Sequence, residues 1–91
     1  MKVRSIRDLA AVVRGRRRDI GLSQAELAAR AGVSRKWIYQ FEAGKPTAEL
    51  GLILRVLDAL GLVLDVTHDE RAAADQPTRD LDALIEAYRA R

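Results

Sequence analysis

Residues 22–45, LSQAELAARAGVSRKWIYQFEAGK, decide how this chain folds. Ser23 is a good N-cap residue, and the strong helix formers of residues 24–31 follow it. Gly32 ends this predicted helix, because a sharp exit from a helix usually needs a residue at positive φ, where glycine has no Cβ to clash. The apolar face of the helix is made of Leu27, Ala28 and Ala31.

A second helix is predicted directly after the glycine turn. Val33 fills the corner and Ser34 is a second N-cap. The helix runs from Arg35 to about Glu42, before residues 43–44 end it. At about 100° per residue its side chains separate onto an apolar face of Trp37, Ile38 and Phe41 and an outer face of Arg35, Lys36, Tyr39, Gln40 and Ala43. The two apolar faces must pack together, so the pair forms a helix-turn-helix.

The outer face of the second helix predicts DNA recognition. Its side chains are long donors on a helix of the right length for a major groove. Arg35 and Lys36 suit guanine and Gln40 suits adenine, each good bidentate pair contributing about 1–3 kcal/mol of discrimination. The alternative is a charged face that is merely hydrated. The turn glycine, the two caps and the basic context favour DNA.

Charge is divided unevenly along the 91 residues, although the net charge is only +3. Residues 1–46 hold eleven Lys or Arg against four acids, or +7, and residues 47–91 hold five against nine, or −4. A positive half supplies the salt-sensitive, sequence-independent part of nucleic-acid affinity. Membrane-surface binding is the competing use, but Arg14, Arg16, Arg17 and Arg18 lie on several sides of a helix and face no broad apolar surface.

Composition narrows the function classes further. The chain has no cysteine and a single histidine, His68, so disulfide frameworks, thiolate metal sites and histidine triads are unavailable. It has no glycine-rich phosphate loop and no apolar run of membrane-spanning length. We therefore expect no enzyme, no metal and no cofactor. The expected protein is soluble, cytoplasmic and associated with a bacterial nucleoid.

Helices are also predicted on both sides of the helix-turn-helix. Ser5 and Asp8 resemble a capping box for a helix ending near Ile20, with Ile6, Leu9, Val13 and Ile20 buried and with Arg14, Arg16 and Arg18 near phosphates. After a linker at residues 45–47, Thr47 is expected to cap a helix over residues 48–60 that Gly61 ends. Its core stripe is Leu50, Ile53, Leu54, Leu57 and Leu60.

The hydrophobic period changes to two after Gly61 and predicts one short β-strand over residues 62–67. A lone strand cannot complete its own ladder, so we expect it to pair with the same strand of a second copy about a two-fold axis. The alternative is an extended tail. The dimerisation residues would be Leu62, Val63, Leu64, Asp65, Val66 and Thr67.

Three segments resemble those of one protein family: LSQAELAARAGVS (22–34), FEAGKPT (41–47) and LVLDV (62–66). They are similar to the lambda-repressor-like (Xre/Cro) helix-turn-helix family, and more narrowly to HipB-type antitoxins, whose genes adjoin a HipA-type serine/threonine kinase toxin. The resemblance covers about residues 3–68. It implies a mainly α fold of four to five helices, with one C-terminal β-strand pairing across a dimer.

The resemblance also assigns roles to residues. Base contacts fall on Arg35, Lys36, Tyr39 and Gln40. A phosphate contact falls on Gln24, and we expect the others at Ser34, Trp37, Lys45 and Arg18. The family's buried ion pair falls on Arg17 and Glu42.

Three units are therefore expected: a DNA-binding domain with its dimerisation strand over residues 1–67, an acidic linker over 68–77, and an amphipathic helix over 78–91. The apolar face of that last helix, Leu81, Leu84, Ile85 and Tyr88, either packs back on the dimer or binds a partner. The expected function is a dimeric repressor of a palindromic operator that is also the antitoxin of a HipA-like kinase. The alternative is an ordinary Xre-family regulator without a toxin partner.

Overall fold

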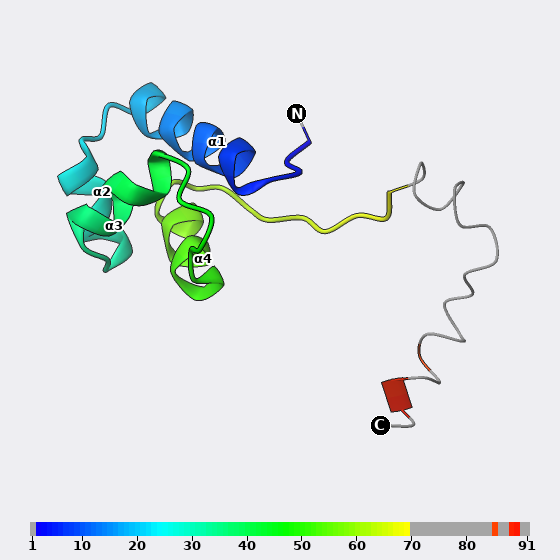
Figure 1. Cartoon of the computed structure of the whole chain (residues 1–91). Helices are drawn as coiled ribbons and strands as arrows, with labels where there is room; N and C mark the ends of the chain where they lie inside the picture. Colours follow the sequence, from blue (N-terminus) through cyan, green and yellow to red (C-terminus); the bar gives the residue numbers. More distant parts are fainter. Residues whose placement is uncertain (1, 70–84, 86–87, 90–91) are drawn as a thin grey trace.

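The computed structural model describes residues 2–69, 85, 88 and 89. Four helices form a small globule, as Figure 1 shows: α1 (Ile6–Asp19), α2 (Gln24–Ala31), α3 (Arg35–Glu42) and α4 (Leu50–Ala59). The described residues contain no strand, and the segment after α4 leaves the globule below the N-terminal residues. The predicted mainly α helix-turn-helix class is confirmed. No helix in this described part is long and apolar enough to cross a membrane.

The first three helices begin at serine caps, as the sequence predicts. The hydroxyl oxygens of Ser5, Ser23 and Ser34 each accept a hydrogen bond from the backbone N–H three residues later, at 3.0–3.1 Å. The backbone N–H of Ser23 also donates to the Glu26 carboxylate at 3.1 Å, which completes a capping box at α2. These caps fix where the two short helices of the helix-turn-helix begin.

All four described helices end in the same glycine motif. After the glycine, the next backbone N–H reaches back to the carbonyl five residues earlier, at 2.8–3.1 Å, which is the Schellman arrangement. The glycines are Gly21, Gly32, Gly44 and Gly61. In three of the turns the following residue packs on or into the core, namely Leu22, Val33 and Leu62, whereas Gly44 is followed by the exposed Lys45.

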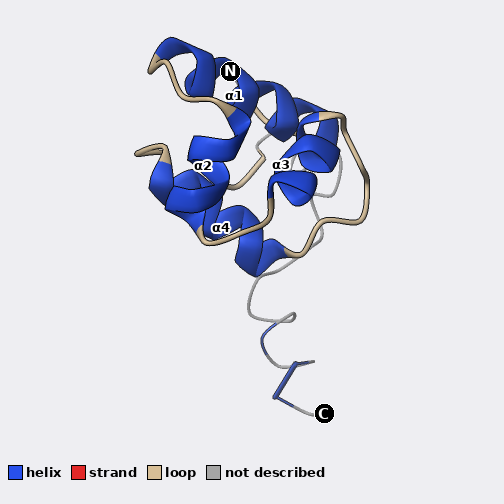
Figure 2. Ribbon diagram, turned by 90° about the vertical axis from the view of Figure 1, so that its left-hand side faces the viewer, coloured by secondary structure: helices blue, strands red, loops and turns tan. Residues whose placement is uncertain are grey.

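The core lies where all four helices meet (Figure 2), with α2 packed against α3 and α4 and with α1 packed against α3. Its largest fully buried side chains are Phe41, Leu27, Ile38, Leu60, Val13 and Val56. Of the two predicted apolar faces of the helix-turn-helix, Leu27, Ala28, Ala31, Ile38 and Phe41 are buried, and Trp37 is half-buried against them. This packing holds α3 with its polar face outward.

The predicted core of α1 is wrong at one position. Ile20 is 39% exposed, because it follows the last helical residue and the chain turns at Gly21. Leu22 takes the core position after the turn and is 7% exposed.

The start of α4 also differs from the prediction. Thr47 does not cap it. The N-cap is Glu49, whose side chain makes no capping hydrogen bond. The helix begins later than predicted because Ala48 packs against the core before it. This later start is accompanied by a different buried stripe: Ile53, Val56, Leu57 and Leu60 are buried. Leu50 and Leu54, which the hydrophobic pattern assigns to the core, are 59% and 45% exposed.

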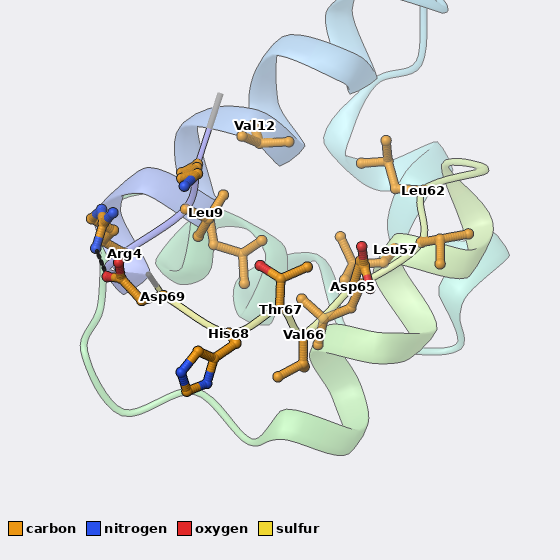
Figure 3. A pocket seen from close by; sticks show the side chains of 14 residues that line it. Arg4, Leu9, Val12, Leu57, Leu62, Asp65, Val66, Thr67, His68 and Asp69 are labelled. Atoms are coloured by element: carbon orange, nitrogen blue, oxygen red, sulfur yellow. Dashed lines mark hydrogen bonds and ion pairs between the residues drawn. The ribbon is translucent and has the colours of Figure 1, made fainter. Parts of the chain in front are cut away.

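Residues 62–69 form an extended segment without a strand assignment in the single chain. A hollow of about 600 Å³ is lined by this segment, the N-terminal residues, α1 and α4. Figure 3 shows the side chains that line it. An exposed ion pair, Arg4 Nη1 to Asp69 Oδ2 at 2.9 Å, joins two of its walls. The expected strand needs a second copy and stays a prediction. His68 and Asp69 of the expected acidic linker belong to this extended segment. The rest of the linker, and the expected last helix apart from Ile85, Tyr88 and Arg89, lie outside the described residues.

Candidate nucleic-acid interface

The outer face of α3 is the most concentrated set of exposed donors on the helix-turn-helix. Arg35, Lys36 and Tyr39 are exposed and Gln40 is half-buried, while Ile38 and Phe41 on the opposite side are at most 1% exposed. The four side chains predicted to contact bases therefore lie on one accessible side of a rigidly packed helix. That arrangement can place several hydrogen-bond donors against base edges at once.

The first turn of α3 is anchored by two contacts. The Trp37 ring stacks on Phe41, with centroids 5.2 Å apart and planes 9° from parallel. The Ser34 hydroxyl accepts the Trp37 N–H at 3.0 Å and keeps its own O–H free to donate. The N-terminus of α3 also carries the positive end of the helix dipole, which favours a phosphate. The phosphate contacts expected of Ser34 and Trp37 are compatible with this geometry.

A buried ion pair joins α1 to the end of α3, as the family resemblance implies. Arg17 Nε and Nη2 donate to the two oxygens of Glu42, at 2.7 and 2.9 Å. Arg17 Nη1 donates to the Leu22 carbonyl at 2.9 Å, next to the start of α2. The Glu42 hydrogen bond raises the pKa of the Arg17 guanidinium above its ordinary value, against the opposing effect of burial. Arg17 therefore holds three elements together and is not available to DNA.

Gln24 belongs to the same network. Its Nε2 donates to Glu42 Oε1 at 3.3 Å, so the first residue of α2 is tied to the last residue of α3. One amide N–H remains for a phosphate oxygen. The network thus fixes the expected phosphate-binding end of α2 relative to the recognition helix. The sequence contains no signal for this contact, because it depends on how the two helices cross.

Some arginines of α1 donate hydrogen bonds to carbonyls within the described part of the protein and others do not, a difference that the sequence does not reveal. Arg14 Nη1 donates to the Glu42 carbonyl at 3.3 Å, and Arg16 Nε donates to the Leu60 carbonyl at 3.0 Å. These side chains stabilise the C-terminal ends of α3 and α4, where the helix dipole favours a cation. Both side chains therefore have an internal role, and the expectation that they also lie near phosphates stays a prediction. Arg18 is exposed, as a phosphate contact requires.

The turn after α3 places one more cation beside the outer face of α3. Lys45 is exposed, and its Nζ lies 3.4 Å from Gln40 Oε1. This contact orients the Gln40 amide so that its NH₂ group points away from the lysine, which is the group that would donate to adenine. Lys45 remains able to donate to a phosphate at the same time.

Comparison with known proteins identifies the family. A profile described as "Helix-turn-helix domain" matches residues 8–74. The chain belongs to this helix-turn-helix family. It is 43% identical over 65 residues to an uncharacterized HTH-type transcriptional regulator, y4mF, of Sinorhizobium fredii, covering 71% of this chain and 86% of that one. An uncharacterized HTH-type transcriptional regulator of Methanothermobacter thermautotrophicus is 42% identical over 50 residues, covering 55% and 72% of the two chains.

Solved structures agree with the sequence comparison. The protein in a "HipB-O4 20mer complex" superposes with a TM-score of 0.70 at 26% identity, covering 75% of this chain and 96% of that one. A chain in "Structure of HipA-HipB-O2-O3 complex" matches with the same TM-score, identity and coverage. This protein is therefore a DNA-binding transcriptional regulator with a HipB-like helix-turn-helix fold.

Proposed function

We propose that this regulator is a repressor that binds a palindromic operator as a dimer and also acts as the antitoxin of a HipA-like kinase. The observation that carries the DNA-binding part is the exposed face of Arg35, Lys36, Tyr39 and Gln40 on a helix whose end is fixed by the Arg17–Glu42 pair. Pre-organised donors bind DNA with little loss of side-chain and backbone freedom. The face is therefore suited to sequence-specific recognition.

Selection from a random DNA library tests the repressor. The full chain should enrich a palindrome whose half-sites are centred about one helical turn apart, because each copy of a dimer reads one half-site. The match to the protein in the "HipB-O4 20mer complex" supports this expectation. Enrichment of no sequence, or of one unrepeated half-site, would contradict a dimeric repressor.

The dimer contact we propose is the segment of residues 62–67. Val63 and Val66 are 90% and 87% exposed there, and the extended backbone has no ladder partner in the described chain. A second copy antiparallel to it would satisfy these groups and cover the valines. The two recognition helices would then lie about 34 Å apart, one turn of DNA.

Two truncations test this contact in analytical ultracentrifugation. A chain ending after Gly61 should be monomeric with weak operator affinity, because it lacks residues 62–67. A chain ending after Asp69 keeps the segment and should remain a dimer. If the shorter chain stays dimeric, the main dimer contact lies elsewhere, for example at the exposed Leu50 and Leu54.

The antitoxin role rests on the HipB-like fold and on the charge division of the chain. One matching HipB-type structure also contains HipA, and the acidic half of this chain is suited to a protein partner rather than to DNA. Co-expression with the adjacent reading frame tests it. The role fails if that frame is harmless alone, or if its product neither co-purifies with this chain nor tightens its binding to the operator. The protein would then be an ordinary Xre-family regulator.

A further inference from the structure

The turn after α3 differs from the other three glycine turns in the residue that follows the glycine. In the turns at Gly21, Gly32 and Gly61 the residue after the glycine is apolar and packs on or into the core. After Gly44 the corresponding residue is Lys45, held by its backbone N–H on the Gln40 carbonyl at 3.1 Å. The same backbone geometry therefore holds a cation at the surface, beside the recognition face.

A second cation, Arg7, lies against this turn. Arg7 belongs to the first turns of α1, and its Cγ is 3.5 Å from the position that a Cβ on Gly44 would occupy. In Figure 1 the connection after α3 passes directly beneath α1, which agrees with this contact. The aliphatic stem of Arg7 thus lies against the glycine, and its side chain is exposed.

Arg7 differs from the arginine two helical turns further along α1. Arg14 faces the same end of α3 but is half-buried and donates to the Glu42 carbonyl. Arg7 makes no hydrogen bond or ion pair with any described residue. The nearby carboxylate of Glu42 is buried and already paired with Arg17, so it does not neutralise Arg7. A guanidinium in this position is free to bind an external anion.

We propose that Arg7 and Lys45 form a phosphate clamp that binds the DNA backbone at the C-terminal end of the recognition helix. The inference rests on the proposed DNA-binding function and adds α1 to the interface. Gly44, at a φ of +89°, allows the sharp turn at which the Arg7 stem and Lys45 both lie. Arginine binds phosphate through two parallel N–H groups and lysine as a point charge, so the pair fixes register without reading sequence.

Salt dependence of binding by the full-length protein tests the clamp. Affinity is measured over a salt series for two probes, the duplex enriched by selection and a 30-base-pair duplex of random sequence. Arg7→Gln keeps much of the stem over Gly44 but removes the charge, and Arg7→Lys keeps the charge. Arg30→Gln is the matched control, because Arg30 is also exposed but lies in the last turn of α2.

The clamp predicts a specific pattern. Arg7→Gln should reduce the slope of log affinity against log salt by about 0.9 for each phosphate that the protein no longer neutralises, or about 1.8 for a dimer. Lys45→Gln should do the same, Arg7→Lys should restore most of the slope, and Arg30→Gln should leave it unchanged. The preference for the selected duplex over the random one should stay the same in Arg7→Gln, Arg7→Lys and Arg30→Gln. Lys45→Gln is judged by its slope alone, because it also removes the contact that orients the Gln40 amide.

Two results overturn the proposal in distinguishable ways. If Arg7→Gln matches Arg30→Gln in slope while the wild type binds DNA, the clamp is wrong and the proposed function stands. If the wild type binds neither duplex, the DNA-binding function fails and the clamp fails with it. Thermal denaturation of Arg7→Gln separates a charge effect from loss of fold, because the clamp predicts an unchanged melting temperature.

Discussion

Three arginines of α1 and two cations of α3 belong to the same basic half of the chain but make different contacts. Arg14, Arg16 and Arg17 donate to carbonyls or a carboxylate within the protein. Arg35 and Lys36 are exposed and make no such contact with the described residues. The net charge of this half therefore includes cations with contacts inside the protein as well as cations that have none in its described part.

The largest effect should come from breaking the buried pair. Glu42→Ala leaves the Arg17 guanidinium buried without its partner and should reduce the free energy of unfolding by about 3–5 kcal/mol. Urea denaturation followed by circular dichroism measures it. Glu49→Ala is the control, because Glu49 is exposed and makes no capping hydrogen bond, and it should unfold like the wild type. If Glu42→Ala also unfolds like the wild type, the pair has no structural importance.

Substitutions on the outer face of α3 should have a smaller effect, and it should fall on DNA sequence preference rather than on stability. Arg35→Ala and Gln40→Ala should each remove about 1–3 kcal/mol of discrimination at one base position per half-site. The melting temperature should not change, because neither side chain supports the core. Mobility-shift assays against single-base variants of the selected duplex measure the loss. Unchanged sequence preference in both variants would show that α3 does not read bases through these residues.

Two arginines of α1, Arg16 and Arg18, should differ in whether they contribute to stability or to DNA affinity. Arg16→Gln removes a charged donor from the Leu60 carbonyl and should cost about 1 kcal/mol of stability, a value discounted because the contact is only partly buried. Arg18→Gln should leave stability unchanged and weaken binding to all DNA sequences. Melting curves and salt-series affinities are measured for both. Reversed outcomes would mean that Arg18 has the structural role and Arg16 contacts DNA.

The smallest expected effect concerns pH at the start of α2. Hydrogen bonds from Ser23 hold the pKa of Glu26 below its ordinary value. The folded state therefore favours the charged carboxylate, and this contribution is present at neutral pH and lost as the pH falls through the lowered pKa. Between pH 7 and 3, the wild type should lose a little more melting temperature than Glu26→Gln. Parallel curves for the two proteins would contradict the capping-box contribution.

The sequence predicts best what local chemistry determines. The helix-turn-helix boundaries follow from Ser23, Gly32 and Ser34, because a cap or a positive-φ glycine acts within a few residues. The predicted start of α4 is wrong because Thr47 offers a good local cap, while packing of Ala48 against distant residues delays the helix. Local preference is overridden where tertiary packing contributes more free energy.

In the candidate site, too, the features set by local sequence are predictable and those set by tertiary packing are not. The exposed face of α3 can be predicted from helical periodicity alone. The internal roles of Arg14 and Arg16 cannot, because each depends on where a carbonyl at the end of another helix lies in space. The contact between Gln24 and Glu42 is of the same kind, since it joins residues 18 positions apart through a helix crossing. Such contacts have no periodic signature in the sequence.

The stacking of Trp37 on Phe41 gives the molecule a built-in optical reporter. Trp37 is the only tryptophan in the chain, and it lies half-buried in the first turn of the recognition helix. Its fluorescence emission therefore reports the environment of that helix alone, whereas circular dichroism averages over every helix. Titration with unlabelled DNA can be followed through this one indole. Coincident fluorescence and dichroism melting curves would indicate that the recognition helix unfolds together with the whole domain.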